Sequence, residues 1–320
     1  MILLALYMVC SATASRAQLP LGGPMMGVIY DSGKHALVPV PGTPGASSLA
    51  ASIELDPRLQ GVSISPGGDY GLAVDELARL VLMRLDGHAP IIDALQLDPS
   101  DIRIVFSPTG SSVLIHLRNE KEICILSGLP QQPRLLWRQA QDLPFDPGQL
   151  AVSDNGAAVL FGTPVEEPAA LFVITAGNWP QQIVQQSPVA IEFLPKRDDA
   201  VFADALNRQL VVIENVTNSP QLRVIADERD GMVSPIAIAT SQDGTRVFAV
   251  NKGSETILIA SIGGGGVTSV SCACLPTGLH RFQGNAVFRL TDLAGKGIPL
   301  WVLDANSAEP RTVFIPAPTQ

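Results

Sequence analysis

The sequence is poor in charged, aromatic and basic residues. Only 16% of its 320 residues are charged and 5% are aromatic, whereas 46% are hydrophobic. This balance excludes an intrinsically disordered chain, which has too little apolar surface to bury. Asp and Glu outnumber Lys and Arg by 30 to 21, a formal net charge of −9. Because the few basic residues are scattered along the chain, nucleic acids and anionic membrane surfaces are not expected as partners.

Long apolar runs are also lacking. No segment reaches the 18 or more apolar residues that a transmembrane helix needs, so we expect no membrane insertion of the mature chain. The short apolar run Ile2–Val9 is followed by small residues, as in a secretory signal, although no Lys or Arg precedes it. We therefore expect residues 1–17 to be a signal peptide, cleaved after Ala17 or, alternatively, after Ala14. The protein should be secreted or periplasmic.

Cysteine is scarce, with four residues in the whole chain. Cys10 lies in the predicted signal, and Cys124 lies in a continuous apolar run that predicts a buried side chain. Cys272 and Cys274 are separated by one residue, a spacing near the upper limit for a bridge on a strand. In an oxidising compartment they form a local disulfide if the chain kinks there, and otherwise stay a free pair. Only His280 lies nearby as a further soft ligand, so no metal site is predicted.

A turn signal is present instead, and it returns at intervals of roughly 34–47 residues. It is followed each time by a short apolar stretch and then by a second, more continuous one. This periodicity, with several short strands in each repeat, is typical of a β-propeller. The clearest copies are SPGGDY from Ser65, SPTGSS from Ser107, SDNGAA from Ser153, SQDGTR from Ser241 and RFQGNA from Arg281, with weaker copies at Asp31 and Leu194.

The clearest repeat, Pro235–Leu275, holds four apolar stretches joined by tight turns and predicts one four-stranded antiparallel blade. Third stretches such as Leu80–Met83 and Leu210–Ile213 are continuously apolar, which indicates strands buried on both faces between stacked blades. Counting turns gives seven units, while six or eight stay open. These units are residues 26–56, 57–98, 99–142, 146–187, 188–229, 232–275 and 276–317.

We therefore predict an all-β fold, a seven-bladed β-propeller of four-stranded antiparallel blades. A lead-in at residues 18–25 should precede a single propeller domain over residues 26–317. The first unit is irregular, because a Pro- and Gly-rich segment at Val40–Ser48 occupies the middle of the expected blade. We expect the ring to close by pairing strands from its two ends, with the C-terminal stretch Thr312–Ile315 beside N-terminal residues.

The segment SQDGTRVFAVNKGSETILIASIGGG, which begins at Ser241, resembles the repeat of secreted YVTN-type propellers. The resemblance implies the propeller fold, an extracytoplasmic location and a binding or scaffolding role. Lactonase-like enzymes share seven-bladed folds with similar repeats, which gives the alternative of a hydrolase with its site at one end of the central channel. That alternative predicts acidic, Arg or His side chains from several blades gathered there.

No catalytic, cofactor or metal site is predicted from the residues themselves. Asp residues in the turns are expected to cap their own backbone rather than to bind calcium. Trp179 lies on a loop and is the one aromatic candidate for a contact residue. We therefore expect a non-catalytic scaffold that binds an unknown protein or surface polymer, with a redox-responsive module at Cys272 and Cys274 as a weaker alternative. The four histidines lie on different units without ligand spacing: His35, His88, His116 and His280.

Overall fold

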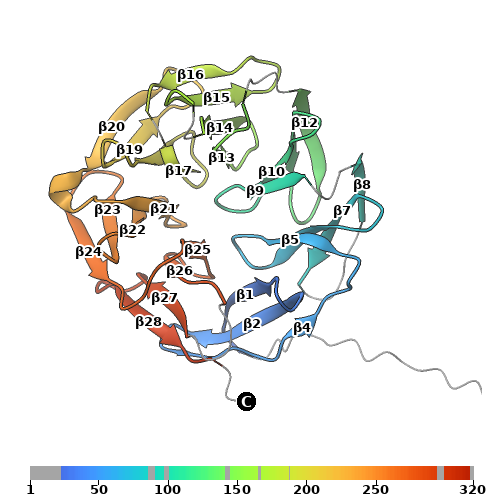
Figure 1. Cartoon of the computed structure of the whole chain (residues 1–320), viewed down its shortest axis with the longest axis horizontal. Helices are drawn as coiled ribbons and strands as arrows, with labels where there is room; N and C mark the ends of the chain where they lie inside the picture. Colours follow the sequence, from blue (N-terminus) through green and yellow to red (C-terminus); the bar gives the residue numbers. More distant parts are fainter. Residues whose placement is uncertain are drawn as a thin grey trace, which may run out of the picture.

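The protein is described here by a computed structural model, over residues 23–85, 91–96, 101–140, 145–164, 167–186, 188–293 and 299–317. The predicted signal peptide lies outside the described residues. Seven four-stranded antiparallel sheets surround a common axis (Figure 1). Among the described residues, the one helical element is a 3-10 turn at Glu228–Asp230. The predicted fold class and the count of seven blades are confirmed.

Six of the blades are simple meanders, in which the strands pair in chain order from the axis outward. The second blade contains β5 (Gln60–Ile64), β6 (Tyr70–Val74), β7 (Arg79–Arg84) and β8 (Ile91–Gln96), and the third β9 (Ile102–Phe106), β10 (Ser112–Leu117), β11 (Glu122–Ser127) and β12 (Arg134–Ala140). The fourth contains β13 (Gln149–Val152), β14 (Ala158–Gly162), β15 (Leu171–Thr175) and β16 (Gln181–Val184), and the fifth β17 (Pro188–Phe193), β18 (Ala200–Asp204), β19 (Gln209–Glu214) and β20 (Gln221–Ala226). The sixth contains β21 (Pro235–Thr240), β22 (Arg246–Asn251), β23 (Thr256–Ser261) and β24 (Val267–Ser271), and the seventh β25 (His280–Arg281), β26 (Val287–Arg289), β27 (Leu300–Asp304) and β28 (Arg311–Ile315).

The repeated turn joins the first and second strands of a blade, except that the weaker copy predicted at Asp31 lies in the turn between the second and third strand places of the first blade. In four copies the glycine N–H donates to the carbonyl of the serine three residues earlier at 2.9 Å, and the glycine has a φ of 66–76°. Few residues other than glycine adopt this left-handed conformation at low cost, which explains why the signal is visible in the sequence. These glycines are Gly68, Gly110, Gly156 and Gly244.

Turn carboxylates hold neighbouring blades together as well as their own backbone. Asp243 accepts a hydrogen bond from the N–H of Thr245 at 3.0 Å, as expected of a residue that caps its own turn. Asp154 differs, because it accepts from Thr109 of the third blade at 2.6 Å and from the N–H of Lys196 of the fifth at 2.7 Å. The prediction of purely local capping is therefore wrong for Asp154. The turn that contains Asp154 lies between the turns of the third and fifth blades, and each of these donates a hydrogen bond to a different carboxylate oxygen of Asp154.

The core lies between blades rather than inside any one of them. All six residues of β10 are buried, whereas β12, at the outer rim, is mostly exposed. One apolar cluster joins Leu72 and Leu82 of the second blade to Ile115 and Leu126 of the third, and similar clusters link other neighbours. Each blade therefore covers the faces of the blades beside it. No helix among the described residues is long and apolar enough to span a bilayer.

The first blade has a different arrangement. It contains β1 (Met25–Asp31), β2 (Ala36–Thr43), β3 (Ala46–Ser47) and β4 (Ile53–Glu54); β2 pairs with β1 on one side and with both β3 and β4 on the other. The β1–β2 turn ends at His35, whose φ of 50° matches the 52° of Glu255 in the β22–β23 turn. The His35 carbonyl accepts from Leu55, as the Glu255 carbonyl accepts from Cys272. Hence β1, β2 and β4 occupy the places of second, third and fourth strands.

The ring closes by side-chain packing. β28 pairs with β27 as the outermost strand of the seventh blade, and no strand of the first blade pairs with the seventh among the described residues. The expectation of closure by strand pairing is therefore not met, because β28 already completes its own blade. Ile315 nevertheless packs in one cluster with Met26 and Phe282, and the Gln283 N–H donates to the Met26 carbonyl at 2.7 Å.

Candidate functional site in the central channel

A cavity of about 450 Å³ lies where β1, β5 and β25 meet near the axis. This volume falls within the range of small-molecule sites. One wall is formed by residues 27–30 of β1, a second by residues 62–65 of the second blade and a third by residues 280–283 of the seventh blade. Gly68, Ile104, Phe106 and Arg289 complete the lining. The cavity is therefore apolar on the side of the second and third blades and basic on the side of the seventh.

Arg281, on β25, is the most constrained charge of this cavity. Its side chain is only 6% exposed, and its Nη2 atom lies 3.3 Å from Oε1 of Glu192 on β17. The same nitrogen donates to the Thr240 carbonyl on β21, and the guanidinium lies over the Phe288 ring at 5.3 Å. The other nitrogen, Nη1, is buried and has no hydrogen-bond partner among the described residues. A buried donor without a partner carries a free-energy cost that a bound acceptor would remove.

Glu192 is held by the sixth blade. Its Oε2 accepts from the Thr240 N–H at 3.0 Å, and its Oε1 accepts from the Thr240 hydroxyl at 3.2 Å. Burial raises the pKa of Glu192 above its usual range, while the Arg281 guanidinium and the Thr240 hydrogen bonds oppose that rise. Its oxygens are thus engaged within the protein, and Glu192 does not line the cavity.

A second basic group lies beside Arg281. Arg289, on β26, has Nη1 3.1 Å from Oδ1 of Asp292, and burial lowers the pKa of its guanidinium. His280 has Nε2 4.0 Å from the same Asp292 oxygen. Burial, followed by the charge of Arg289, lowers the pKa of His280 to about 4. At neutral pH this wall therefore presents two guanidinium groups and a neutral imidazole, a set suited to a carboxylate or another anion.

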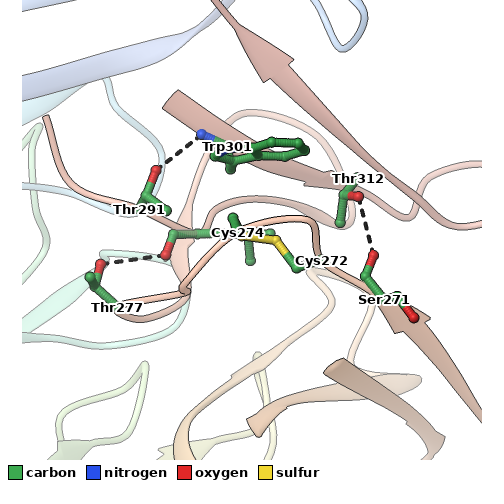
Figure 2. Close-up of a disulfide and its surroundings, with 8 residues drawn as sticks. Ser271, Cys272, Cys274, Thr277, Thr291, Trp301 and Thr312 are labelled. Carbon is green, nitrogen blue, oxygen red and sulfur yellow. Dashed lines mark hydrogen bonds between the residues drawn. A yellow bond between two sulfur atoms is a disulfide. The ribbon is translucent and has the colours of Figure 1, made fainter. Parts of the chain in front are cut away.

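A disulfide shapes the segment that leads to these residues. Cys272 and Cys274 are bonded in the structure, with their Cα atoms 5.0 Å apart, directly after β24 (Figure 2). The Thr312 hydroxyl donates to the Ser271 carbonyl at 3.3 Å and fixes the start of this segment against β28. The chain then runs to β25, so the bridge constrains the connection that delivers His280 and Arg281. That this bridge forms in the protein in solution stays a prediction.

The other residues singled out in the sequence lie elsewhere. Trp179 is 73% exposed on the loop between β15 and β16 and does not line the cavity. His116 is buried on β10, and its Nδ1 has no hydrogen-bond partner among the described residues; Oδ1 of Asp146 is 3.7 Å away. Cys124 is buried and free, and burial raises its thiol pKa to about 11. His88 lies outside the described residues.

Arg281 and Glu192 were not identified from the sequence as site residues. In the sequence, Arg281 marks only the start of a turn signal, and Glu192 lies within the apolar stretch Val189–Phe193. The signal that could have found them is a charge inside an innermost strand, because such a strand faces the channel. The described residues contain no group of three or more His, Cys, Asp or Glu that could hold a metal ion.

Comparison with known proteins supports the fold. A functionally unknown protein from Desulfotomaculum acetoxidans DSM 771 matches with a TM-score of 0.61 and 13% identity, over 92% of this chain and 95% of that protein. The β-propeller domain of Cps50 (Swd1) from Myceliophteria thermophila matches with a TM-score of 0.50 and 13% identity, over 85% and 94% of the two chains. Likenesses at this identity show a β-propeller and nothing of its activity. No protein-family model and no curated protein sequence matches the chain.

Proposed function

We propose that the protein is an exported, non-catalytic propeller whose channel cavity binds an acidic group of a protein or surface polymer. One observation carries this proposal. Arg281 lines the cavity, and its buried Nη1 has no hydrogen-bond partner among the described residues, while Nη2 of the same guanidinium is fixed by Glu192 and Thr240. A guanidinium held in this way offers a preorganised donor to an incoming carboxylate.

The charge distribution supports the same function. The whole chain carries a formal charge of −9, so its surface repels acidic molecules in general. The cavity wall of the seventh blade instead carries Arg281 and Arg289, which are paired with Glu192 and Asp292 respectively. An acidic ligand would therefore bind selectively at this wall. The extracytoplasmic location in this proposal rests on the N-terminal signal alone.

The test uses glutarate as a probe, with the exported protein in calorimetric titrations at constant ionic strength and chloride as the reference anion. We expect weak saturable binding that Arg281→Gln reduces by about tenfold, the loss of one charge-assisted hydrogen bond. Arg223→Gln is the matched control, because Arg223 pairs with Glu214 and also donates to the Ile262 carbonyl, away from the cavity. Equal affinity in wild type and Arg281→Gln would contradict the proposal, provided circular dichroism shows both folded.

The hydrolase alternative has one observation in its favour. His280 is neutral at pH 7 and lies on the same cavity wall as two guanidinium groups, so it could act as a general base while they stabilise an oxyanion. A pH-stat assay with a γ-lactone would test this alternative. Turnover that His280→Asn abolishes and Arg223→Gln leaves unchanged would support a hydrolase, and no turnover would contradict it.

A further inference from the structure

Among the described residues, the first blade has no strand at its innermost place. In the other six blades the innermost strand is the first of the meander and pairs only with the second. In the first blade β1 takes the place of a second strand, as its turn to β2 and the Leu55–His35 hydrogen bond show. β1 pairs with β2 alone, so among the described residues no strand pairs with its edge toward the axis, where the Met26 carbonyl accepts one hydrogen bond from the Gln283 N–H. Figure 1 shows this edge between the hairpins that begin with β5 and β25.

Val28 and Tyr30 present their backbone groups at this edge. Val28 lies opposite Pro39 in the β1–β2 register. Pro39 has no N–H, and its carbonyl accepts from Ala50 at 2.9 Å on the far side of β2, so Val28 exchanges no hydrogen bond with it. In an antiparallel pair the N–H and C=O of alternate residues point to the same edge. The backbone N–H and C=O groups of Val28 and Tyr30 therefore point to the axis.

The cavity occupies the missing place. Its lining includes the four consecutive residues 27–30 of β1, flanked by residues 62–65 on one side and 280–283 on the other. An innermost strand in a propeller lies between the same three neighbours. A segment placed there would therefore pair with β1, would set one of its faces on Val62 and Ile64, and would turn the other toward Arg281 and Arg289.

We propose that an extended acidic peptide segment of a partner protein adds to the edge of β1 as the missing innermost strand, with a carboxylate on the free Nη1 of Arg281. This inference rests on the proposed function and specifies the ligand. Addition of a strand to a sheet edge draws affinity from main-chain hydrogen bonds and specificity from alternate side chains. A segment of about five residues fits, since β5 and β9 each contain five.

Charge favours a partner over the chain's own N-terminus. Five residues separate β5 from β6, β9 from β10 and β21 from β22. The same spacing before β1 would place an intramolecular strand at about residues 15–19, a stretch that contains Arg16. Arg16 would bring a positive charge to a wall that already carries Arg281 and Arg289. Predicted cleavage after Ala17 would also divide that stretch.

The probe is the pentapeptide acetyl-Val-Glu-Val-Glu-Val-amide, whose alternation places valines on one face and glutamates on the other. Two versions carry N-methyl groups on the valines or on the glutamates, so that each blocks hydrogen bonding from one edge only. We expect one pattern to weaken binding by about tenfold and the other to leave it unchanged. Replacing both glutamates by glutamine should weaken binding to wild type but not to Arg281→Gln.

Amide hydrogen exchange supplies a second measurement. The bound peptide should slow exchange at Val28 and Tyr30 by about tenfold or more, whereas glutarate should not. Equal effects of the two N-methyl patterns, or no protection at these amides, would overturn strand addition, and glutarate binding would then still support the proposed function. Failure of both probes would contradict both. The same exchange measurement on a chain that begins at Ser15 tests the chain's own segment as the occupant. If Val28 were protected in that chain without any peptide, and if that chain no longer bound the peptide, the proposal would be overturned.

Discussion

The Arg281 guanidinium of the seventh blade lies 3.3 Å from the Glu192 carboxylate of the fifth, and Thr240 of the sixth hydrogen-bonds to both. Three blades are thus joined at the channel wall by one buried charge and its partner. Arg281 also lines the cavity, and its buried Nη1 has no hydrogen-bond partner among the described residues, so the residue proposed to bind a ligand is part of the structure that holds the ring together. Stability and binding are therefore coupled at this residue.

Removing Glu192 should be costly. Glu192→Ala leaves Arg281 buried without its counter-charge, and we expect a loss of about 3 kcal/mol in the free energy of unfolding, measured in urea. The control is Glu214→Ala, which removes the partner of the more exposed Arg223 and should cost no more than about 1 kcal/mol. Similar losses for the two variants would show that the Arg281–Glu192 pair contributes no more than a surface pair.

Ring closure should depend on the lack of a side chain at Gly27. A Cβ there would lie 2.7 Å from Cδ1 of Phe282, which is buried in the cluster that joins the first and seventh blades. We expect Gly27→Ala to lower the unfolding free energy by about 1–3 kcal/mol, the usual cost of overpacking. Phe282→Leu should recover part of that loss in the double variant.

Gly263→Ala is the control for that prediction, because nothing lies within 4 Å of its Cβ position. If Gly27→Ala were as stable as Gly263→Ala, the contact between Gly27 and Phe282 would have no role in closure. A double-mutant cycle over Gly27 and Phe282 measures the coupling directly.

The propeller could be predicted from the sequence because its signals are local. The turn glycines, such as Gly68 and Gly244, sit at left-handed positions that few other residues occupy, and the buried strands are continuously apolar. The channel site could not be predicted, since Arg281 and Glu192 are 89 residues apart and meet only when the fifth and seventh blades are placed in the ring. The first blade was recognised as irregular at Val40–Ser48, but its open edge depends on how β4 pairs with β2, which composition does not reveal.

The Cys272–Cys274 bridge should add little global stability. It closes a loop of three residues, for which chain entropy gives about 1–2 kcal/mol. We expect the double variant Cys272→Ser with Cys274→Ser to lose no more than this, and reduced wild type to match it in urea unfolding. Alkylation with mass spectrometry should find no reactive thiol in the native protein over residues 18–320, because Cys124 is buried with a raised pKa. Two alkylated thiols without reductant would show that the pair is free.

His116 should be replaceable without loss. Its Nδ1 is buried and has no hydrogen-bond partner within the described part of the chain, and burial is the main reason that its pKa is lowered. Replacing a buried, unsatisfied group by an apolar one removes a desolvation cost, so His116→Leu should leave the unfolding free energy unchanged or raise it. Ser153→Ala, which removes the hydroxyl that accepts from the Ala158 N–H at 3.0 Å, should instead cost about 1 kcal/mol. A loss in His116→Leu as large as that in Ser153→Ala would indicate a bond to His116 in solution.

His280 should make stability and binding depend on pH. Its pKa of about 4 in the folded chain lies below the 6.5 of an unfolded histidine, so the unfolded state binds more protons between these values. The contribution of His280 to stability should be complete above pH 6.5, fall as the pH drops toward 4 and change little below that. His280→Asn should remove this pH dependence of the unfolding free energy, measured in urea. The effect should be small, because half of the side chain is exposed and solvent screens its charge.

Arg289→Gln removes a nearby positive charge and should raise the pKa of His280, as followed by NMR of the imidazole Cε1–H. A bound acidic peptide should raise it further, and a pKa near 6.5 in the free protein would contradict the desolvation and the Arg289 charge that lower the pKa of this half-exposed residue.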